Sequence, residues 1–423
     1  MARYRSAEIR GEKQPVRFAI GPGTLVTAAF IGPGTITTAS VAGASFGYAL
    51  AWGLVVATFA AIILQDLAAR LAIVSDKGVG RLLGEALPKG VLRFVIIGVA
   101  IVALYGGNAA YEAGNLVGGA LGIGLLVKDV EVPRLVTVLI PTTIASFAVM
   151  SPNYRTIERR LLVIVALMAT AFLVTAIIIL FRTPETPPAP LWPLRIPNGG
   201  ASIALALVGT TVVPYNLFLH GAAARERWHG GGDTGSVDQM LRASRIDTVV
   251  AIGLGGLVSL AILFLAARLS FSTSIYGPAD MARALAPLFG IAAQGIFAFG
   301  LMTAGVTSAV TAPLATAYAF GEFTGRKAPF GSREFRTVAL SVVWIGAFFA
   351  LFGGTPIGII LTAQLANGFL LPFAAIGLMA LGMSRAIMGR HRLTGFHLIL
   401  VAIVVLVALT LGGRLIMRTF GAL

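Results

Sequence analysis

The chain has 423 residues, of which 57% are apolar and only 12% are charged, and its mean hydropathy is +0.90. A soluble domain does not need so much apolar surface, so this composition excludes a soluble protein and predicts an all-α polytopic membrane protein. The absence of cysteine excludes disulfides, thiolate metal sites and cysteine nucleophiles, and the formal net charge is +15.

The first 17 residues are basic and polar, and they contain no small-residue cleavage site. We interpret this segment (1–17) as a cytoplasmic tail rather than a signal peptide. Apolar runs of about 20 residues, the length that crosses a bilayer, follow from Phe18 onward. Eleven spans are predicted, at residues 18–48, 50–74, 92–124, 135–150, 160–181, 200–223, 245–267, 288–319, 337–353, 356–383 and 394–413.

Lysines and arginines are distributed unevenly between the two sides of the predicted membrane. With the N-terminus inside, 23 of the 32 lie in cytoplasmic segments, 8 lie on the opposite side and Arg70 lies within a span. Cytoplasmic loops of membrane proteins carry such an excess. The bias predicts an integral protein of a prokaryotic-type plasma (inner) membrane, with its N-terminus cytoplasmic and its C-terminus outside. It explains the basicity without a nucleic-acid partner.

The spans divide into two halves. Spans one to five (18–183) and six to ten (199–384) each open with a helix interrupted by glycine and proline. An odd number of spans per half places the halves in opposite orientation, as in inverted-repeat transporters. A proline-rich external connection (184–198) joins them, and residues 385–423 hold span eleven and the C-terminus. Signatures of nucleotide, metal-cluster and Ser-His-Asp sites are absent, so we expect neither an enzyme nor a cofactor.

The first interruption is Gly32-Pro33-Gly34-Thr35, within span one. Pro33 cannot donate a backbone hydrogen bond, and Gly34 permits unusual dihedral angles. We expect one half-helix to end near Ile31 and another to begin near Thr35, so that free carbonyl and N–H groups face each other at mid-membrane. Such a break is tolerated mainly where it lines a binding site. A simple proline kink is the alternative.

The second interruption is Val213-Pro214-Tyr215, within span six and about half a protein away. Thr210 and Thr211 precede it and Asn216 follows it, so hydroxyl groups and an amide gather at the turn. The alternative is that each threonine bonds to a carbonyl one turn earlier, which is frequent in membrane helices. Paired breaks in corresponding halves indicate the substrate site of a transporter.

The runs GPGTLVTAAFIGPGTITTASVAGASFGY and VGTTVVPYNLFLHGA resemble the first and sixth spans of the NRAMP family of divalent-metal transporters. The similarity continues through LQDLAARLAIV, SRIDT, AGVTSAVTAP and QLANGFLLPF, and so covers essentially the whole chain. The resemblance implies a LeuT-type fold, a 5+5 inverted repeat plus an eleventh helix, with helices 1 and 6 unwound at mid-membrane.

The chain departs from this family where the resemblance places the metal ligands. The family reads Asp-Pro-Gly-Asn at the first break and Met-Pro-His at the second, and its Asp, Asn and Met side chains hold the metal. In this chain Gly32 and Thr35 occupy the positions of the Asp and the Asn, and Val213 occupies the position of the Met. Gln364 of span ten is retained. Without a carboxylate or a thioether, transition metals should bind poorly, so we assign no metal ligand.

The N–H groups at the starts of the second half-helices then favour an anion. We predict a secondary transporter that moves a small inorganic anion, with bicarbonate (the substrate of some NRAMP-related carriers) ranked first, by alternating access. A carrier for Mg²⁺ or Mn²⁺ that uses carbonyl groups and water is the first alternative, and a receptor that has lost transport is the second. The predicted substrate-binding residues line both breaks and span ten: Gly32, Pro33, Gly34, Thr35, Thr38, Thr210, Thr211, Val213, Pro214, Tyr215, Asn216 and Gln364.

Two titratable residues within the spans are candidates for coupling transport to co-transported H⁺. Glu112 lies in span three, and an acid inside a membrane is a functional candidate by default. His220 lies in span six, and histidine titrates near neutral pH. The alternative for each is a structural role, with Glu112 also open to a place in the outer vestibule. The expected partners are therefore the lipid bilayer, the anion and a proton.

Overall fold

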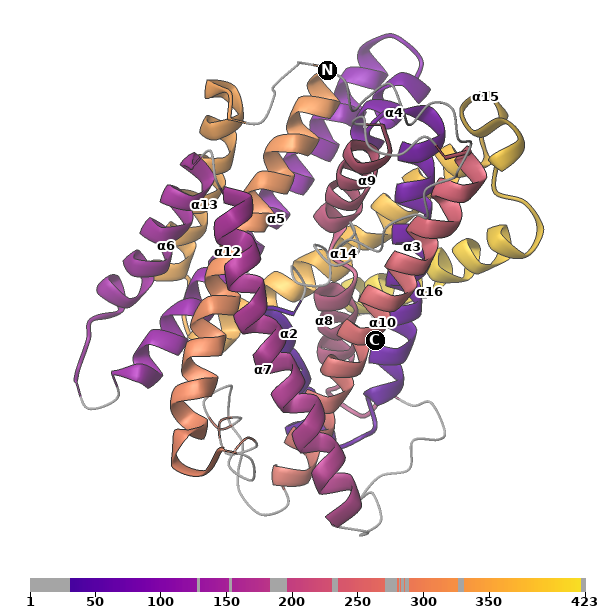
Figure 1. Ribbon diagram of the computed structural model, residues 1–423. Coiled ribbons are helices and arrows are strands. Elements are labelled where there is room, and N and C mark those ends of the chain that lie inside the picture. Colours follow the sequence, from indigo (N-terminus) through magenta and orange to yellow (C-terminus); the bar gives the residue numbers. More distant parts are fainter. Residues whose placement is uncertain are drawn as a thin grey trace, which may run out of the picture.

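The computed structural model describes residues 31–419 apart from 128–129, 152–153, 183–195, 230–234, 271–279, 281, 283–284, 286–288 and 326–330. All regular elements in these residues are helices (Figure 1). Nine helical segments of this part of the chain are long and apolar enough to cross a membrane, and Arg134–Met150 is a shorter apolar helix. The predicted all-α polytopic membrane architecture is therefore confirmed.

Each predicted span from two to eleven corresponds to a helix or, for span six, to a helix pair. The long helices are α2 (Pro33–Phe46), α3 (Ala51–Ser75), α5 (Val91–Leu126), α6 (Arg134–Met150), α7 (Tyr154–Arg182), α8 (Ala201–Thr211), α9 (Pro214–His229), α10 (Val237–Ser270), α12 (Ala293–Thr324), α13 (Arg333–Phe352), α14 (Pro356–Met383) and α16 (Gly395–Thr419). The short ones are α4 (Val79–Ala86), α15 (Arg385–Met388), η2 (Gly290–Ala292) and η3 (Gly389–His391). The first half of predicted span one lies outside the described residues.

Several helices extend beyond the apolar runs that predict them. α10 begins at Val237 rather than near residue 245, and α9 continues to His229 rather than ending near residue 223. Hydropathy marks where the chain leaves the bilayer, whereas capping and hydrogen bonding decide where a helix ends. α13 shows such a cap, because the Ser332 hydroxyl accepts the Phe335 N–H at 3.2 Å.

The helices pack as two groups, with α14 between them. α2, α3, α8, α9 and α10 contact one another, whereas α5, α6, α12 and α13 form the second group. Figure 1 shows α6 and α13 on one side of the molecule, α3 and α10 on the other, and α14 crossing between them. α14 contacts both α5 and α8, so it joins the two groups.

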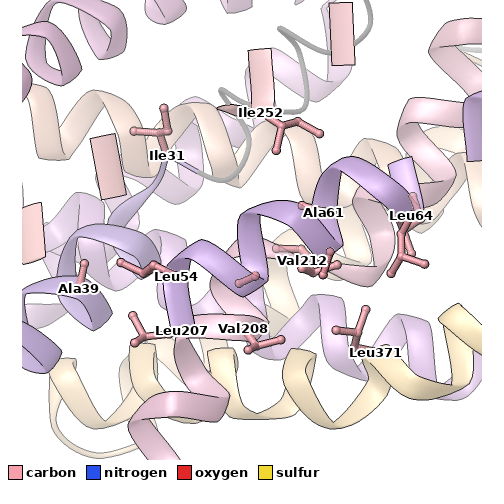
Figure 2. Packing of buried hydrophobic residues seen from close by; sticks show 14 of the residues in the cluster. Ile31, Ala39, Leu54, Ala61, Leu64, Leu207, Val208, Val212, Ile252 and Leu371 are labelled. Atoms are coloured by element: carbon pink, nitrogen blue, oxygen red, sulfur yellow. The ribbon is translucent and has the colours of Figure 1, made fainter. Parts of the chain in front are cut away.

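The contact between α8 and α14 is unusually close. Figure 2 shows Leu207 and Val208 of α8 beside α14, which carries Leu371, and all three side chains are buried. A β-carbon on Gly209 would collide with the carbonyl oxygen of Gln364 and lie 2.6 Å from the backbone nitrogen of Gly368. The two backbones therefore touch, as membrane helices do where small residues line the interface.

Candidate functional site

The predicted break in span six is present. α8 ends at Thr211 and α9 begins at Pro214, while Val212 has φ −109° and ψ 76°, outside the helical region. The Asn216 N–H donates to the Val213 carbonyl oxygen at 3.0 Å, which closes a tight turn instead of a helical one. Pro214 has no N–H to donate, so the ladder of hydrogen bonds cannot cross this point.

The described half of the break in span one begins at Pro33, two residues before the predicted start near Thr35. Proline is favoured in the first turn of a helix because the N–H that it lacks has no helical partner there. Gly32 precedes it with extended backbone angles (φ −112°, ψ −174°), and its carbonyl oxygen accepts the Ile36 N–H at 3.1 Å. The half-helix before Ile31 lies outside the described residues.

The two breaks lie next to each other. The hydroxyl oxygens of Thr35 and Thr210 are 2.9 Å apart, although these residues are separated by 175 positions in the sequence. Both side chains are fully buried. This hydrogen bond joins the start of α2 to the last turn of α8, so a ligand between the breaks would contact both halves of the chain.

α14 supplies the third wall through Gln364. A β-carbon on Gly34 would overlap the side-chain nitrogen of Gln364 and lie 2.8 Å from its amide carbon. The Gln364 side chain is buried, and its Oε1 has no hydrogen-bond partner among the described residues. An amide oxygen without a partner among the described residues therefore lies at the start of α2, against Gly34, which directly precedes Thr35.

Two other predicted residues place unpaired polar atoms near the breaks. The hydroxyl of Thr38, one turn into α2, and both amide atoms of Asn216, in the first turn of α9, are buried without a partner among the described residues. Thr211 differs, because its hydroxyl donates to the Leu207 carbonyl oxygen at 2.9 Å within its own helix. For Thr211 the alternative of a structural hydrogen bond is therefore correct.

Tyr215 joins the second break to α5, and Val213 lies within the break two residues before it. Both are fully buried. The Tyr215 ring packs edge-on against the ring of Tyr111 on α5, with the ring centres 5.4 Å apart. This contact joins the first turn of α9 to α5, and so joins the two helix groups at the second break.

Glu112 does not face the breaks. A β-carbon on Gly346 of α13 would lie 2.5 Å from the Glu112 Cγ, so this side chain points into the contact between α5 and α13. Glu112 is fully buried, its Oε2 accepts from Asn115 Nδ2 at 3.4 Å, and its Oε1 has no partner among the described residues. The acid therefore lies inside the second helix group, next to Tyr111 in sequence but on another face of α5.

His220 also lies away from the threonine pair. Its Nε2 is 3.0 Å from the hydroxyl oxygen of Thr248 on α10, and both side chains are buried. Thr248 in turn donates to the Ser244 carbonyl oxygen at 2.8 Å. His220 thus joins α9 to α10 within the first helix group.

The sequence interpretation missed Asn367. This residue lies on α14, three positions after Gln364, and both of its amide atoms are buried without a partner among the described residues. The available signal was a second amide side chain within the same apolar span. Residues three apart lie on the same side of a helix, so Asn367 extends the polar face that begins at Gln364.

The described part of the site is neutral and rich in oxygen. No group of three or more His, Asp or Glu residues that could hold a metal occurs among the described residues. The available ligands are the side-chain oxygens of Gln364, Asn216 and Thr35, together with backbone carbonyl groups. Oxygen ligands of this type suit a hard divalent cation that keeps part of its water shell.

Comparisons with known proteins agree on one family. The family described as "Natural resistance-associated macrophage protein-like" matches residues 23–418. The chain is 30% identical over 398 residues to "Divalent metal cation transporter MntH 1" of Pseudomonas aeruginosa, covering 91% of this chain and 88% of that protein. It is 29% identical over 424 residues to "Divalent metal cation transporter MntH" of Acidiphilium cryptum, covering 99% and 94% of the two chains.

Solved structures support the fold. The Eremococcus coleocola manganese transporter, in complex with an aromatic bis-isothiourea substituted compound, matches with a TM-score of 0.73 at 21% identity and covers 97% of this chain and 90% of its own. The closed, ligand-bound structure of Mhp1, a nucleobase-cation-symport-1 family transporter, matches with a TM-score of 0.53 at 15% identity and covers 97% and 96%. The predicted LeuT-type fold is confirmed.

The prediction of an anion substrate, with bicarbonate first, is wrong. The relatives carry the name of divalent metal cation transporters, and a manganese transporter shares the fold. The prediction counted the lost side-chain ligands and the N–H ends of the second half-helices. It gave too little weight to the carbonyl end of α8, which carries partial negative charge, and to the neutral oxygen of Gln364.

Proposed function

This chain belongs to the Nramp family, and we propose that it is a secondary transporter that carries a divalent metal cation by alternating access at the paired breaks. The proposed ligands are the side-chain oxygens of Gln364, Asn216 and Thr35 together with backbone carbonyl groups at the breaks. The alternative of a receptor that has lost transport is not favoured, because buried polar atoms without a partner are costly unless a ligand satisfies them.

The observation that carries the proposal is the unpaired Oε1 of Gln364. It is buried at the start of α2, where Gly34 leaves room for it, and it has no hydrogen-bond partner among the described residues. An amide oxygen buried without a donor loses about 1–3 kcal/mol of solvation. A cation or its bound water would restore that interaction. Asn216, also buried and unpaired, supports the same interpretation from the second break.

The composition of the site suggests which cation it prefers. Residue 213 is valine, the chain contains no cysteine, and neither break (32–35 and 213–215) contains Asp or Glu. Sulfur ligands favour soft metals such as Cd²⁺, whereas Mg²⁺ and Mn²⁺ accept oxygen ligands and water. We therefore expect similar affinities for Mg²⁺ and Mn²⁺, and no marked preference for Cd²⁺.

The test is uptake by proteoliposomes of Mn²⁺, Mg²⁺ and Cd²⁺ at matched concentrations. We expect saturable uptake of Mg²⁺ and Mn²⁺ that Gln364→Leu weakens about tenfold or more, the loss expected for one hydrogen bond to a charged partner. Gln294→Leu is the matched control, because Gln294 is only partly buried and donates to the Leu125 carbonyl oxygen, far along α5 from the break. Full uptake by Gln364→Leu would contradict the assignment.

Coupling to protons is proposed through Glu112. Its fully buried carboxyl group has an Oε1 without a partner among the described residues, and it neighbours Tyr111, whose ring packs against Tyr215 of the second break. Glu112→Gln should leave the protein folded and able to bind the cation, but it should abolish acidification of the vesicle lumen during uptake. A pH-sensitive dye inside the vesicles measures this. Acidification at the rate of the unmodified protein would remove Glu112 from the coupling path.

His220 is the second coupling candidate, and its contact with Thr248 gives it a structural alternative. His220→Gln keeps a side-chain group that can bond to Thr248. If His220 carries a proton, this variant loses the pH dependence of uptake, and if it only packs, the variant behaves as the unmodified protein does.

The orientation and the segment boundaries are part of the proposal. The positive charge bias supports a cytoplasmic N-terminus and an external C-terminus, with the two repeats at 18–183 and 199–384. Single cysteines introduced before Phe18 and after Thr419 would report the side of each terminus, because the chain has no cysteine of its own. If the cysteine before Phe18 were labelled only from outside the cell, the proposed orientation would be wrong.

A further inference from the structure

The predicted cytoplasmic ends of α3, α9 and α12 meet around the short helix α4. The Phe218 ring of α9 packs against the Phe323 ring of α12, with the ring centres 5.5 Å apart. Further along α9, Arg225 Nε donates to Asp76 Oδ1, just after α3, at 3.0 Å. These contacts hold the ends of α3, α9 and α12 together on this side of the molecule.

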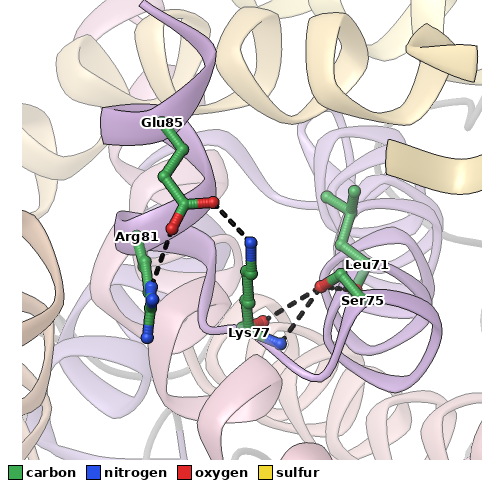
Figure 3. Close-up of polar contacts among 5 residues, drawn as sticks. All are labelled: Leu71, Ser75, Lys77, Arg81 and Glu85. Carbon is green, nitrogen blue, oxygen red and sulfur yellow. Dashed lines mark hydrogen bonds and ion pairs between the residues drawn. The ribbon is translucent and has the colours of Figure 1, made fainter. Parts of the chain in front are cut away.

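α4 is fixed to the end of α3 as one unit. Figure 3 shows Glu85 bonded to both Lys77 and Arg81, with Nζ–Oε2 and Nε–Oε1 distances of 2.6 and 2.8 Å. In the same view the Ser75 hydroxyl donates to the Leu71 carbonyl oxygen at 2.7 Å, and it accepts the Lys77 N–H at 3.1 Å. The turn between α3 and α4 is therefore held by bonds within the turn itself, which tie the start of α4 to the end of α3, while α4 also packs against α9 and α12.

The second helix group adds a hydrogen bond to its packing against α4. Glu322 Oε2, in the last turn of α12, accepts the Gly80 N–H at 2.9 Å across 242 positions of sequence. Gly80 lies in the first turn of α4, where the N–H groups have no helical partner and the helix dipole favours a negative charge. A β-carbon on Gly78 would overlap the Glu322 carboxyl group, so glycine is needed for this approach.

We infer that Glu322 is a positioning residue that latches the cytoplasmic exit closed by binding the start of α4 to α12. The inference rests on the proposed transport function, because the exit it closes is that of the carried cation. When α9 and α12 separate to release the cation, α4 leaves with α3 and the bond to Glu322 must break. Removing this carboxylate should shift the population toward the conformation open to the cytoplasm.

The test uses a cysteine as a reporter of opening, on the full chain reconstituted in lipid. Ala319 of α12 is fully buried, and its carbonyl oxygen lies 3.4 Å from where a β-carbon on Gly80 would stand. The cysteine of Ala319→Cys should react slowly with a water-soluble maleimide. Adding Glu322→Ala should raise that rate about tenfold, the effect of losing a hydrogen bond to a charged group. Glu322→Gln keeps an acceptor oxygen and should give a smaller rise.

The controls separate opening from unfolding. Glu334→Ala removes an exposed acid at the start of α13, on the same side of the molecule, and should leave the rate unchanged. The cysteine of Ala145→Cys, fully buried in α6, should stay unreactive in the Glu322→Ala background, since only a general loss of packing would expose it. An unchanged rate at residue 319 in both Glu322 variants would overturn the latch. Absence of cation uptake by the unmodified chain would refute the proposed function instead, whatever the reaction rates.

Discussion

Gly34→Ala tests the site through a single methyl group. A β-carbon at this position would lie 2.8 Å from the Gln364 amide carbon and overlap its nitrogen, whereas contacts of this kind normally need about 3.4 Å or more. The obstacle is the end of a flexible side chain, so the Gln364 amide should rotate away while the backbone stays in place. The substitution should therefore remove one ligand oxygen from the breaks without removing Gln364.

The expected loss of cation affinity follows from the lost ligand oxygen of Gln364. A hydrogen bond to a charged partner contributes about 1.5–3 kcal/mol, which corresponds to roughly 10- to 100-fold in affinity. We expect the KM for Mg²⁺ or Mn²⁺ uptake to rise by this factor. Thermal stability should change little, because the gain of about 0.5–1 kcal/mol for replacing a helical glycine offsets part of the contact strain.

Uptake into proteoliposomes and the thermal unfolding temperature are measured on the same preparations. Gly253→Ala on α10 is the control, since a β-carbon there meets nothing within 4 Å. In a double-mutant cycle, Gly34→Ala should add nothing to Gln364→Ala, because both act on the same oxygen. An unchanged KM for Gly34→Ala, or full additivity in the cycle, would refute the assignment of Gln364 as a ligand.

Three further predictions concern stability. Gly209→Ala should lower the thermal unfolding temperature more than Gly34→Ala, because its β-carbon meets backbone atoms of α14 that cannot rotate away, at a cost of about 1–3 kcal/mol. Thr35→Val should destabilise by about 1–3 kcal/mol in chemical denaturation, because it removes the hydrogen bond of the buried Thr210 hydroxyl, and the double variant with Thr210→Val should lose less than the sum of the two single losses, because both single variants break the same bond. Hydrogen bonds from Lys77 and Arg81 lower the pKa of Glu85. The stability that these bonds contribute is therefore present above the ordinary pKa of Glu85 and is lost as the pH falls through the lowered pKa. In thermal melts at neutral pH, Glu85→Gln should be less stable than the unmodified protein by less than about 1 kcal/mol, because the site is exposed. In strong acid the two proteins should have the same stability.

The sequence alone determined the features that depend on local chemistry. Apolar runs located spans two to eleven, because a bilayer demands continuous apolar helices of fixed length. Pro214 located the break between α8 and α9, because proline has no N–H to donate to the hydrogen-bond ladder of a helix. Both are properties of a few consecutive residues, so no knowledge of the fold is needed to read them.

The tertiary structure alone decided which side chains meet. Thr35 and Thr210, 175 positions apart, share a hydrogen bond, whereas Thr211 beside them bonds within its own helix. Glu112 turns toward α13 and Gln364 toward Gly34, although both are polar residues within apolar spans. The direction of a side chain depends on how its helix is rotated against its neighbours. That rotation is set by packing between distant segments, which the order of residues along one helix does not contain.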